Sequence, residues 1–189
     1  EGAIALALLK EKQPSLISIS RAHRWEGYFD NRNTGFIPYR DLVFRSLDKI
    51  NFISSDGIGY TTRLFPEYTK KFAISRLGTL KSKYTEDCNM PFTIVSTSFL
   101  IQRKRIDLII NALSLLNTSI RWIHYGDGPE REKLETLSQK KLGSKPNVEY
   151  SFKGQVKNQD ILHDYSLIAP ALFINVSTSE GIPVSIMEA

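Results

Sequence analysis

Short β-branched or apolar runs alternate with longer amphipathic segments along the chain. The strand-like runs comprise residues 15–20, 49–55, 71–77, 92–98, 120–126, 148–154 and 171–177. The helix-like segments comprise residues 1–12, 38–49, 55–65, 105–116, 130–141 and 158–168. This order is typical of parallel β-sheets joined by crossover helices, so we expect an α/β fold.

A polar stretch without periodicity divides these elements into two groups. Residues 81–90 show neither helical nor strand spacing, which is typical of a linker. We therefore expect the last part of one α/β domain (1–82), a linker (83–91) and the first part of a second α/β domain (92–189). Both ends of the sequence fall within helix-like segments, so we expect an internal piece of a longer protein.

Composition limits the class of protein. Of the 189 residues, 41% are hydrophobic and 24% charged, as in soluble globular proteins. No apolar run is long enough to cross a bilayer, and no signal peptide is visible. The single cysteine, Cys88, cannot form an internal disulfide, which fits a reducing compartment such as the cytoplasm. The formal charge of +5 favours anionic partners, although a basic surface without any partner is equally compatible.

The C-terminal stretch STSEGIPVSIMEA carries two carboxylates around a Gly-Ile-Pro element. A helix that begins near Pro183 would direct the neighbouring backbone amides outward and form an anion-binding site. On spacing alone, a capping box in which Glu188 reaches back to the backbone at Ser185 explains the second carboxylate better. The capping box leaves Glu180 unexplained.

Other candidate residues follow the predicted strands. Three consecutive cations, Arg103 to Arg105, come after the run 92–98 and would suit an anionic ligand, but a solvated basic turn is the usual fate of such a run. Glycines follow two further runs, at 126, 128 and 154, where small residues let a ligand approach the backbone. Ordinary strand-to-helix turns use the same residues.

The element from Glu180 to Glu188 resembles the E-x7-E signature of the retaining glycosyltransferases of family 4, also called group 1 glycosyltransferases. The order of domains, linker and strands is similar to the middle of their GT-B fold over essentially the whole chain. The resemblance implies that 1–82 is the C-terminal part of the acceptor-side Rossmann-like domain. It implies that 92–189 begins the Rossmann-like domain that binds the nucleotide-sugar donor.

The resemblance also implies roles for the C-terminal motif. Glu180 would contact the transferred sugar, and Glu188 would accept hydrogen bonds from the ribose hydroxyls. An ionised carboxylate suits a diol because it offers acceptors only. Backbone donors to the sugar and phosphate would come from the segment of Gly181, Ile182, Pro183 and Val184. Pro183 itself cannot donate, because it lacks an N–H.

The family grips the donor's pyrophosphate with an arginine and, five residues later, a lysine. Lys104 matches the lysine, whereas the arginine position falls on Phe99. Either Arg103 or Arg105 compensates for this departure, or Lys104 and the helix N-terminus hold the donor.

By the same resemblance, the glycine turn with Gly126 and Gly128 would lie beside the nucleoside. The backbone of Gly154, Gln155 and Val156 would read the base. A lone histidine is more often structural than catalytic, but His23 matches a family histidine that faces the donor from the N-terminal domain.

Together these residues predict transfer of a sugar from a nucleoside diphosphate to a glycan or lipid-linked acceptor. No D-x-D motif and no Cys or His pair at metal-ligand spacing occurs, so we expect no metal cofactor and no nucleic-acid partner. We expect a cytoplasmic protein whose basic charge permits a peripheral contact at the inner face of the membrane. A nucleotide-sugar epimerase of the same fold, or a non-catalytic module that binds nucleotides or an anionic surface, remain the alternatives. The piece alone is expected to be inactive and to self-associate.

Overall fold

The computed structural model describes residues 2–22, 39–79, 91–180 and 182–189. These residues form two compact units, Glu1–Leu77 and Gly78–Ala189. The predicted linker, 83–91, falls almost entirely outside the described residues. The division into an acceptor-side and a donor-side domain stays a prediction.

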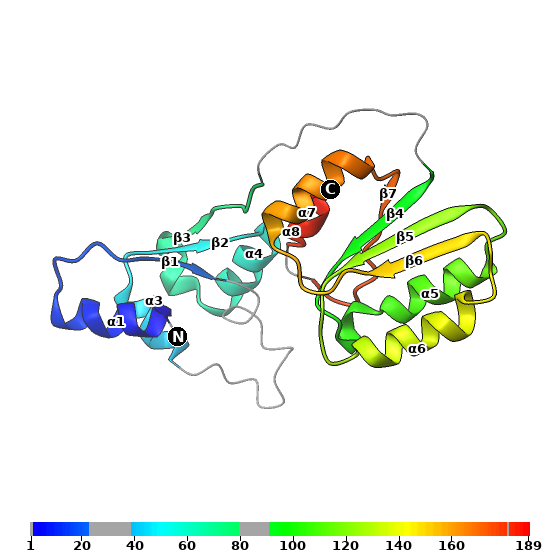
Figure 1. Cartoon of the computed structure of the whole chain (residues 1–189). Helices are drawn as coiled ribbons and strands as arrows, with labels where there is room; N and C mark the ends of the chain where they lie inside the picture. The colour runs from blue at the N-terminus through cyan, green and yellow to red at the C-terminus, as the bar shows by residue number, and fades with distance from the viewer. Residues whose placement is uncertain (1, 23–38, 80–90, 181) are drawn as a thin grey trace. The chain divides into compact units, whose positions relative to one another are not determined.

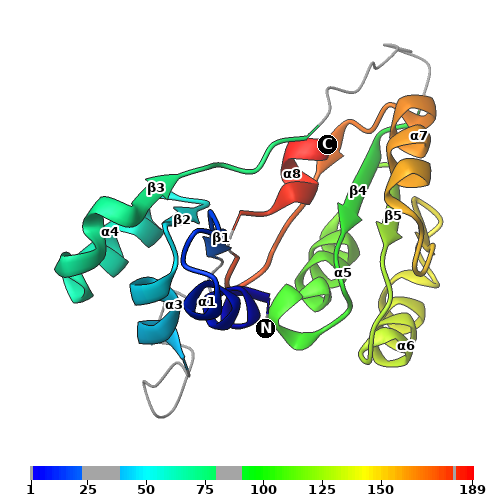
Figure 2. The same cartoon turned by 90° about the vertical axis from the view of Figure 1, so that its left-hand side faces the viewer.

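The first unit is built on a parallel three-stranded sheet in the order β1-β2-β3. Its strands are β1 (Ile19–Ala22), β2 (Lys49–Phe52) and β3 (Phe72–Ile74). Its helices are α1 (Gly2–Lys12), α3 (Arg40–Ser46), α4 (Ser55–Leu64) and the 3₁₀ helix η1 (Pro66–Lys71). Helices α1 and α3 lie side by side (Figure 2).

Aromatic side chains make up much of the core of the first unit. The ring of Phe72 meets those of Phe44 and Phe52 edge-on, with centroid distances of 5.3 and 5.2 Å. This geometry is the one that aromatic pairs prefer, because it sets the positive edge of one ring against the negative face of another. One aromatic cluster therefore joins α3, β2 and β3.

Three details of the first unit differ from the sequence-based expectation. Strand β1 begins at Ile19 rather than at residue 15, because Pro14 lies in a turn and the amide of Ser18 donates to the Asp48 carboxylate. Ser55 and Asp56, which begin the predicted segment 55–65, are residue types typical of a helix cap, but the cap of α4 is Ser54, whose hydroxyl accepts a hydrogen bond from the Gly57 amide. Helix η1 was not expected.

The second unit is built on a parallel four-stranded sheet in the order β6-β5-β4-β7. Its strands are β4 (Thr93–Thr97), β5 (Ile120–Tyr125), β6 (Val148–Phe152) and β7 (Leu172–Phe173). Its helices are η2 (Gln102–Lys104), α5 (Ile106–Leu115), α6 (Arg131–Leu142), α7 (Asn158–Ile168) and α8 (Val184–Glu188). Figure 1 shows α5 and α6 on one face of this sheet and α7 on the other.

Helices on both faces explain why these strands are apolar on consecutive positions. In β4, Ile94 packs in the cluster with α5 and α6, and Val95 packs in the cluster with α7. In β5, Trp122 packs in the cluster with α5 and α6, Ile123 packs in the cluster with α7, and both are buried. Each strand therefore contributes to two cores, as is usual for parallel sheets.

Strand β7 is much shorter than the run 171–177 that predicted it. After Phe173 the amide of Ile174 still donates to Val95, at 2.9 Å, but the chain then leaves the sheet. The Asn175 side chain accepts a hydrogen bond from the Ser177 amide at 2.9 Å, which turns the backbone. The residues after Ile174 therefore form a loop beyond the sheet. No helix in the described part of the chain is long and apolar enough to cross a membrane.

Candidate functional site

The predicted sugar-contact and phosphate-contact residues meet at the carboxyl ends of β4 and β7. The Lys104 ammonium donates to Oε1 of Glu180 at 2.6 Å. Helix η2, just beyond β4, carries the lysine, and the loop beyond β7 carries the glutamate. Their side chains are 17% and 24% exposed, so the pair is largely but not fully shielded from water. Ligands bind to open parallel sheets at this edge.

Neighbouring donors keep the Glu180 carboxylate ionised. Burial by itself raises the pKa of Glu180. Hydrogen bonds from Lys104, Ser177 and Asn175 outweigh this effect, so the pKa of Glu180 lies below its usual value. The Asn175 amide donates to the same oxygen as Lys104, at 3.2 Å. A charged acceptor is therefore present at neutral pH, which suits the predicted contact to sugar hydroxyls.

The two cations beside Lys104 have different surroundings. The carbonyl of Arg103 accepts the Thr178 amide at 3.0 Å, which joins η2 to the loop beyond β7, while the Arg103 side chain is exposed. Arg105 has a left-handed backbone (φ 52°), caps α5, and its Nε donates to Asp107 at 3.4 Å. Arg103 thus has the freer side chain to compensate for Phe99, which is 58% exposed.

The glycine turn after β5 allows two loops to approach closely. A Cβ on Gly126 (φ 134°) would lie 1.9 Å from the Ser98 carbonyl oxygen, and one on Gly128 would lie 2.5 Å from that of Leu100. Only glycine fits these positions, because the loop beyond β4 occupies the space. The contact partner of both glycines in this structure is protein backbone. The predicted contact with a nucleoside stays a prediction.

The predicted base-reading segment follows β6. The Gly126 amide donates to the Gly154 carbonyl at 2.8 Å, so the two glycine turns lie together at one edge. Gln155 is exposed, whereas Val156 packs partly against the core beneath α7. Beside Gly154, the Arg131 guanidinium bonds to Asp127 at 3.0 Å.

The second glutamate of the motif lies in a short helix. Helix α8 begins after Pro183, which is its N-cap rather than its first helical residue, and no side chain caps it. The capping box is therefore wrong, because Ser185 lies inside the helix. Instead, Oε1 of Glu188 accepts a hydrogen bond from Asn158 at 3.0 Å. Gly181 lies outside the described residues, and Ile182, Pro183 and Val184 are half-buried.

A buried chain of polar side chains, for which no sequence pattern provides a signal, supports the same edge. The Trp122 indole donates to the Ser96 hydroxyl at 3.0 Å, and that hydroxyl contacts Nδ1 of His124 at 2.8 Å. Nε2 of His124 lies 3.2 Å from the Ser98 carbonyl. A neutral imidazole with its proton on Nε2 satisfies all three contacts, since the indole can only donate and the carbonyl can only accept. Ser96 on β4 lies directly opposite His124 on β5, and this pairing is visible only once strand register is known.

Burial lowers the pKa of His124 to about 4, with the Ser98 carbonyl opposing the shift. The imidazole is thus neutral at physiological pH, and its role is to fix the start of the loop that leads to Lys104.

Some predicted features fall outside what the structure describes or brings together. His23 lies among residues 23–38, which are not described. Arg21, just before it, donates to the Ser75 hydroxyl at 3.2 Å within the first unit. Among the described residues no group of three or more His, Cys, Asp or Glu side chains could hold a metal ion. Metal independence stays a prediction.

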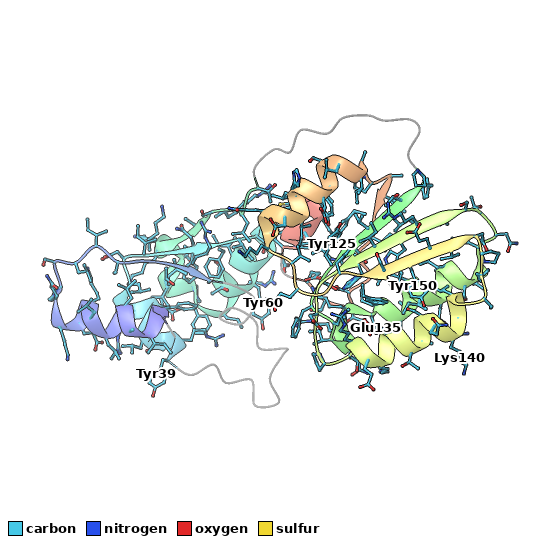
Figure 3. The ribbon with its side chains drawn as sticks, viewed as in Figure 1. Tyr39, Tyr60, Tyr125, Glu135, Lys140 and Tyr150 are labelled. Carbon is cyan, nitrogen blue, oxygen red and sulfur yellow. The ribbon has the colours of Figure 1, made fainter. Side chains whose placement is uncertain are left out.

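A separate hollow of about 680 Å³ lies along the outer strand of the second unit. It is bordered by Glu135 and Lys140 of α6 and by Tyr150 of β6, which Figure 3 labels. The Tyr150 hydroxyl donates to Gln139 across it at 3.0 Å. None of the predicted site residues lines this hollow.

A family model described as "Glycosyl transferases group 1" matches residues 81–189. Since the match covers more than half of the chain, the chain belongs to this family. The UDP-N-acetylglucosamine--peptide N-acetylglucosaminyltransferase GtfA subunit of Streptococcus parasanguinis is 29% identical over 183 residues, which is 92% of this chain and 35% of that protein.

Solved structures share the fold at low sequence identity. A TarM mutant from S. aureus, in complex with Fondaparinux, alpha-GlcNAc-glycerol and UDP, aligns at 16% identity and a TM-score of 0.68, over 90% of this chain and 34% of that one. HepE from Anabaena, in complex with UDP and glucose, aligns at 16% identity and a TM-score of 0.68, over 99% and 53%. The expected GT-B type of α/β fold is confirmed. The chain spans about a third to a half of the length of these relatives.

Proposed function

We propose that this chain is part of a retaining glycosyltransferase that transfers a sugar from a nucleoside diphosphate donor to a glycan or lipid-linked acceptor. The family supports glycosyl transfer as the class of activity. The retaining course, the donor and the acceptor are parts of the proposal.

The pair of Lys104 and Glu180 carries this proposal. It sets a cation and an ionised carboxylate 2.6 Å apart at the carboxyl ends of β4 and β7. A sugar diphosphate has the complementary groups next to each other, anionic phosphates at one end of the glycosidic bond and neutral hydroxyls at the other. Lys104 would neutralise the phosphates and Glu180 would accept hydrogen bonds from the sugar.

Charge development gives Lys104 its catalytic role in the proposal. When the bond between the anomeric carbon and the diphosphate oxygen breaks, negative charge builds on the leaving diphosphate. A fixed ammonium beside it lowers the energy of the transition state more than that of the bound donor. The proposal requires no metal for this step.

A uridine diphosphate sugar is the donor we propose. The names of the GtfA relative and of both solved structures include UDP or a UDP-sugar. Glu188 would hold the ribose, and the backbone at Gly154 would read the base. Sugar transfer to a lipid-linked acceptor would fit a peripheral contact of the protein, through its basic charge, with the inner face of the membrane.

The experiment compares the complete protein with its Glu180→Gln variant. We expect UDP and UDP-sugars to raise the melting temperature of both proteins, because a ligand of the folded state stabilises it. Release of UDP with an acceptor should fall about 100- to 1,000-fold in the variant, which keeps the size but loses the charge of Glu180. Full transfer by Glu180→Gln would show that Glu180 is not part of the active site.

Two other outcomes would replace the proposal. Epimerised nucleotide sugar without any acceptor product would indicate an epimerase. No thermal shift with any nucleoside diphosphate would indicate a module without a donor site.

A further inference from the structure

We infer that Asn175 is a positioning residue that keeps the Glu180 carboxylate in place when Lys104 turns from it to the donor's diphosphate. This inference rests on the proposed function, because it assigns the partners of Glu180 during donor binding. Asn175 does not itself touch the reacting atoms.

The orientation of the Asn175 amide is fixed from both ends. Its Oδ1 accepts the Ser177 amide at 2.9 Å, and its Nδ2 donates to Oε1 of Glu180 at 3.2 Å. A backbone N–H can only donate, so it must face the oxygen of the side-chain amide. The NH₂ group therefore points at Glu180, and a flipped amide would lose both bonds.

The loop that carries these residues is fastened at another point. The Thr178 amide donates to the Arg103 carbonyl at 3.0 Å, so the backbone between Asn175 and Glu180 is held against η2. Side-chain orientation is then the remaining freedom of Glu180, and Asn175 restricts it.

Lys104 and Asn175 donate to the same oxygen of Glu180. A diphosphate carries more negative charge than one carboxylate and competes for the lysine. The neutral amide gains much less from phosphate, since charge-assisted hydrogen bonds are the strong ones. Asn175, together with Ser177, which also lowers the pKa of Glu180, therefore keeps the carboxylate aligned after the lysine has moved.

The test uses two substitutions at this position in the complete protein. Asn175→Leu removes the donor at similar volume, and we expect kcat to fall about 10- to 100-fold while KM for the donor changes little, as for a misplaced catalytic group. Asn175→Asp keeps the shape. Its introduced carboxyl can donate to Glu180 only while protonated and repels it once ionised. Activity of Asn175→Asp should therefore decline with rising pH in a range where the unmodified protein keeps its activity.

Asn147→Asp is the matched control. Asn147 donates to the carbonyls of Leu116 and Thr118, at 3.1 and 2.9 Å, in a turn of the same unit. The same chemical change there removes structural hydrogen bonds, so it should lower the melting temperature and leave the pH profile of transfer unchanged. A pH profile of Asn175→Asp that matches this control would overturn the inference.

A second measurement does not depend on activity. The pKa of the Glu180 carboxyl, followed by ¹³C NMR in this chain, should rise in Asn175→Leu because one hydrogen bond that lowers it is gone. An unchanged pKa together with an unchanged kcat would show that Asn175 does not position Glu180. If Glu180→Gln kept full transfer, the proposed role of Glu180 in transfer would fail, while the NMR result would still decide whether Asn175 orients this carboxylate.

Discussion

Each unit of the molecule contains a short ion pair between a lysine and a carboxylate. The carboxylate of the first pair lies at the start of a strand, whereas the second pair lies beyond the carboxyl ends of the strands. In the first unit Lys10 lies 3.0 Å from Asp48, which immediately precedes β2. In the second unit Lys104 lies 2.6 Å from Glu180, beyond the carboxyl ends of β4 and β7. The residue types are nearly the same, so the difference lies in position and partners.

The pair in the first unit is bonded to backbone groups. The Lys10 ammonium also donates to the carbonyls of Pro14 and Leu16, at 2.8 and 2.6 Å. The Asp48 carboxylate accepts from the amide and hydroxyl of Ser18, at 2.7 and 2.9 Å. These bonds close the turn between α1 and β1 and satisfy backbone groups that the strands leave unpaired. Their role is structural.

The pair in the second unit has a side-chain environment and lies where parallel sheets bind ligands. Its carboxylate is held by Asn175 and Ser177. In the proposed function Lys104 would exchange Glu180 for the ligand while Asn175 and Ser177 hold the carboxylate, and no backbone turn would have to open. The comparison teaches that an ion pair is evidence of function only when its place in the fold and its other partners are known.

The largest expected effect separates the two lysines. Lys104→Met should reduce transfer by the complete protein about 100- to 1,000-fold, because the diphosphate loses its counter-charge. Lys10→Met, the matched change in the first unit, should leave kcat within about twofold and lower the melting temperature instead. Equal losses of kcat in both variants would show that position at the strand ends does not distinguish the pairs.

Close packing at the carboxyl edge gives the next effect. Gly126→Ala should destabilise the second unit by about 3 kcal/mol or more, because the new Cβ would overlap the Ser98 carbonyl at an unfavourable φ. Gly59 of α4 has no atom within 4 Å of its added Cβ. Gly59→Ala should therefore stabilise the first unit by about 0.5–1 kcal/mol. Urea unfolding of both variants measures the contrast, and a neutral Gly126→Ala would contradict it.

The His124 chain makes the second unit sensitive to mild acid. Its pKa falls from an ordinary 6.5 to about 4 in the folded state, so the unfolded chain binds the proton more tightly. The contribution of neutral His124 to the free energy of unfolding is therefore fully present above about pH 6.5. It is lost as pH falls toward 4, by about 3 kcal/mol in total.

His124→Gln should flatten this pH dependence, while His163→Gln, at an exposed position on α7, should leave it unchanged. Chemical unfolding at pH 4.5 and 7 provides the measurement. A slope that persists in His124→Gln would assign the acid sensitivity to other groups.

The smallest effect concerns the first unit at low pH. Hydrogen bonds from Lys10 and from the backbone and hydroxyl of Ser18 lower the pKa of Asp48 to about 2. Its contribution to stability is therefore present above about pH 4 and is lost as pH falls through 2. Asp48→Asn should have a lower melting temperature than the unmodified protein at pH 7. At pH 2 the difference between the two melting temperatures should be smaller. A constant difference across this range would contradict the role of the Asp48 charge.

Sequence periodicity predicted most of the fold. Helices α5, α6 and α7 lie within two residues of their expected bounds, because each buries an apolar face whose spacing is visible in one dimension. The start of β1, the length of β7 and the cap of α4 differ from expectation. Each depends on one polar side chain that competes with the ladder or the helix end for a backbone group.

The candidate site was predicted in part. Glu180, Lys104 and Glu188 came from a local motif and from a resemblance, and the structure brings the first two into contact. Asn175 and His124 had no such signal, since an asparagine late in a strand-like run and a histidine inside a strand are unremarkable in sequence. Their partners are visible only through strand register and loop conformation.

The sequence by itself determined which segments become strands and helices, the order of the two units and the family of the second. Local spacing decides these features, because the apolar face of an element is set by residues near one another in the chain. Only the tertiary structure decided that Lys104 meets Glu180, across 76 positions of sequence. It also decided that Asn175 rather than a capping box supports the motif. Parallel strands bring their carboxyl ends to one edge, and the loops there meet through contacts that no local pattern encodes.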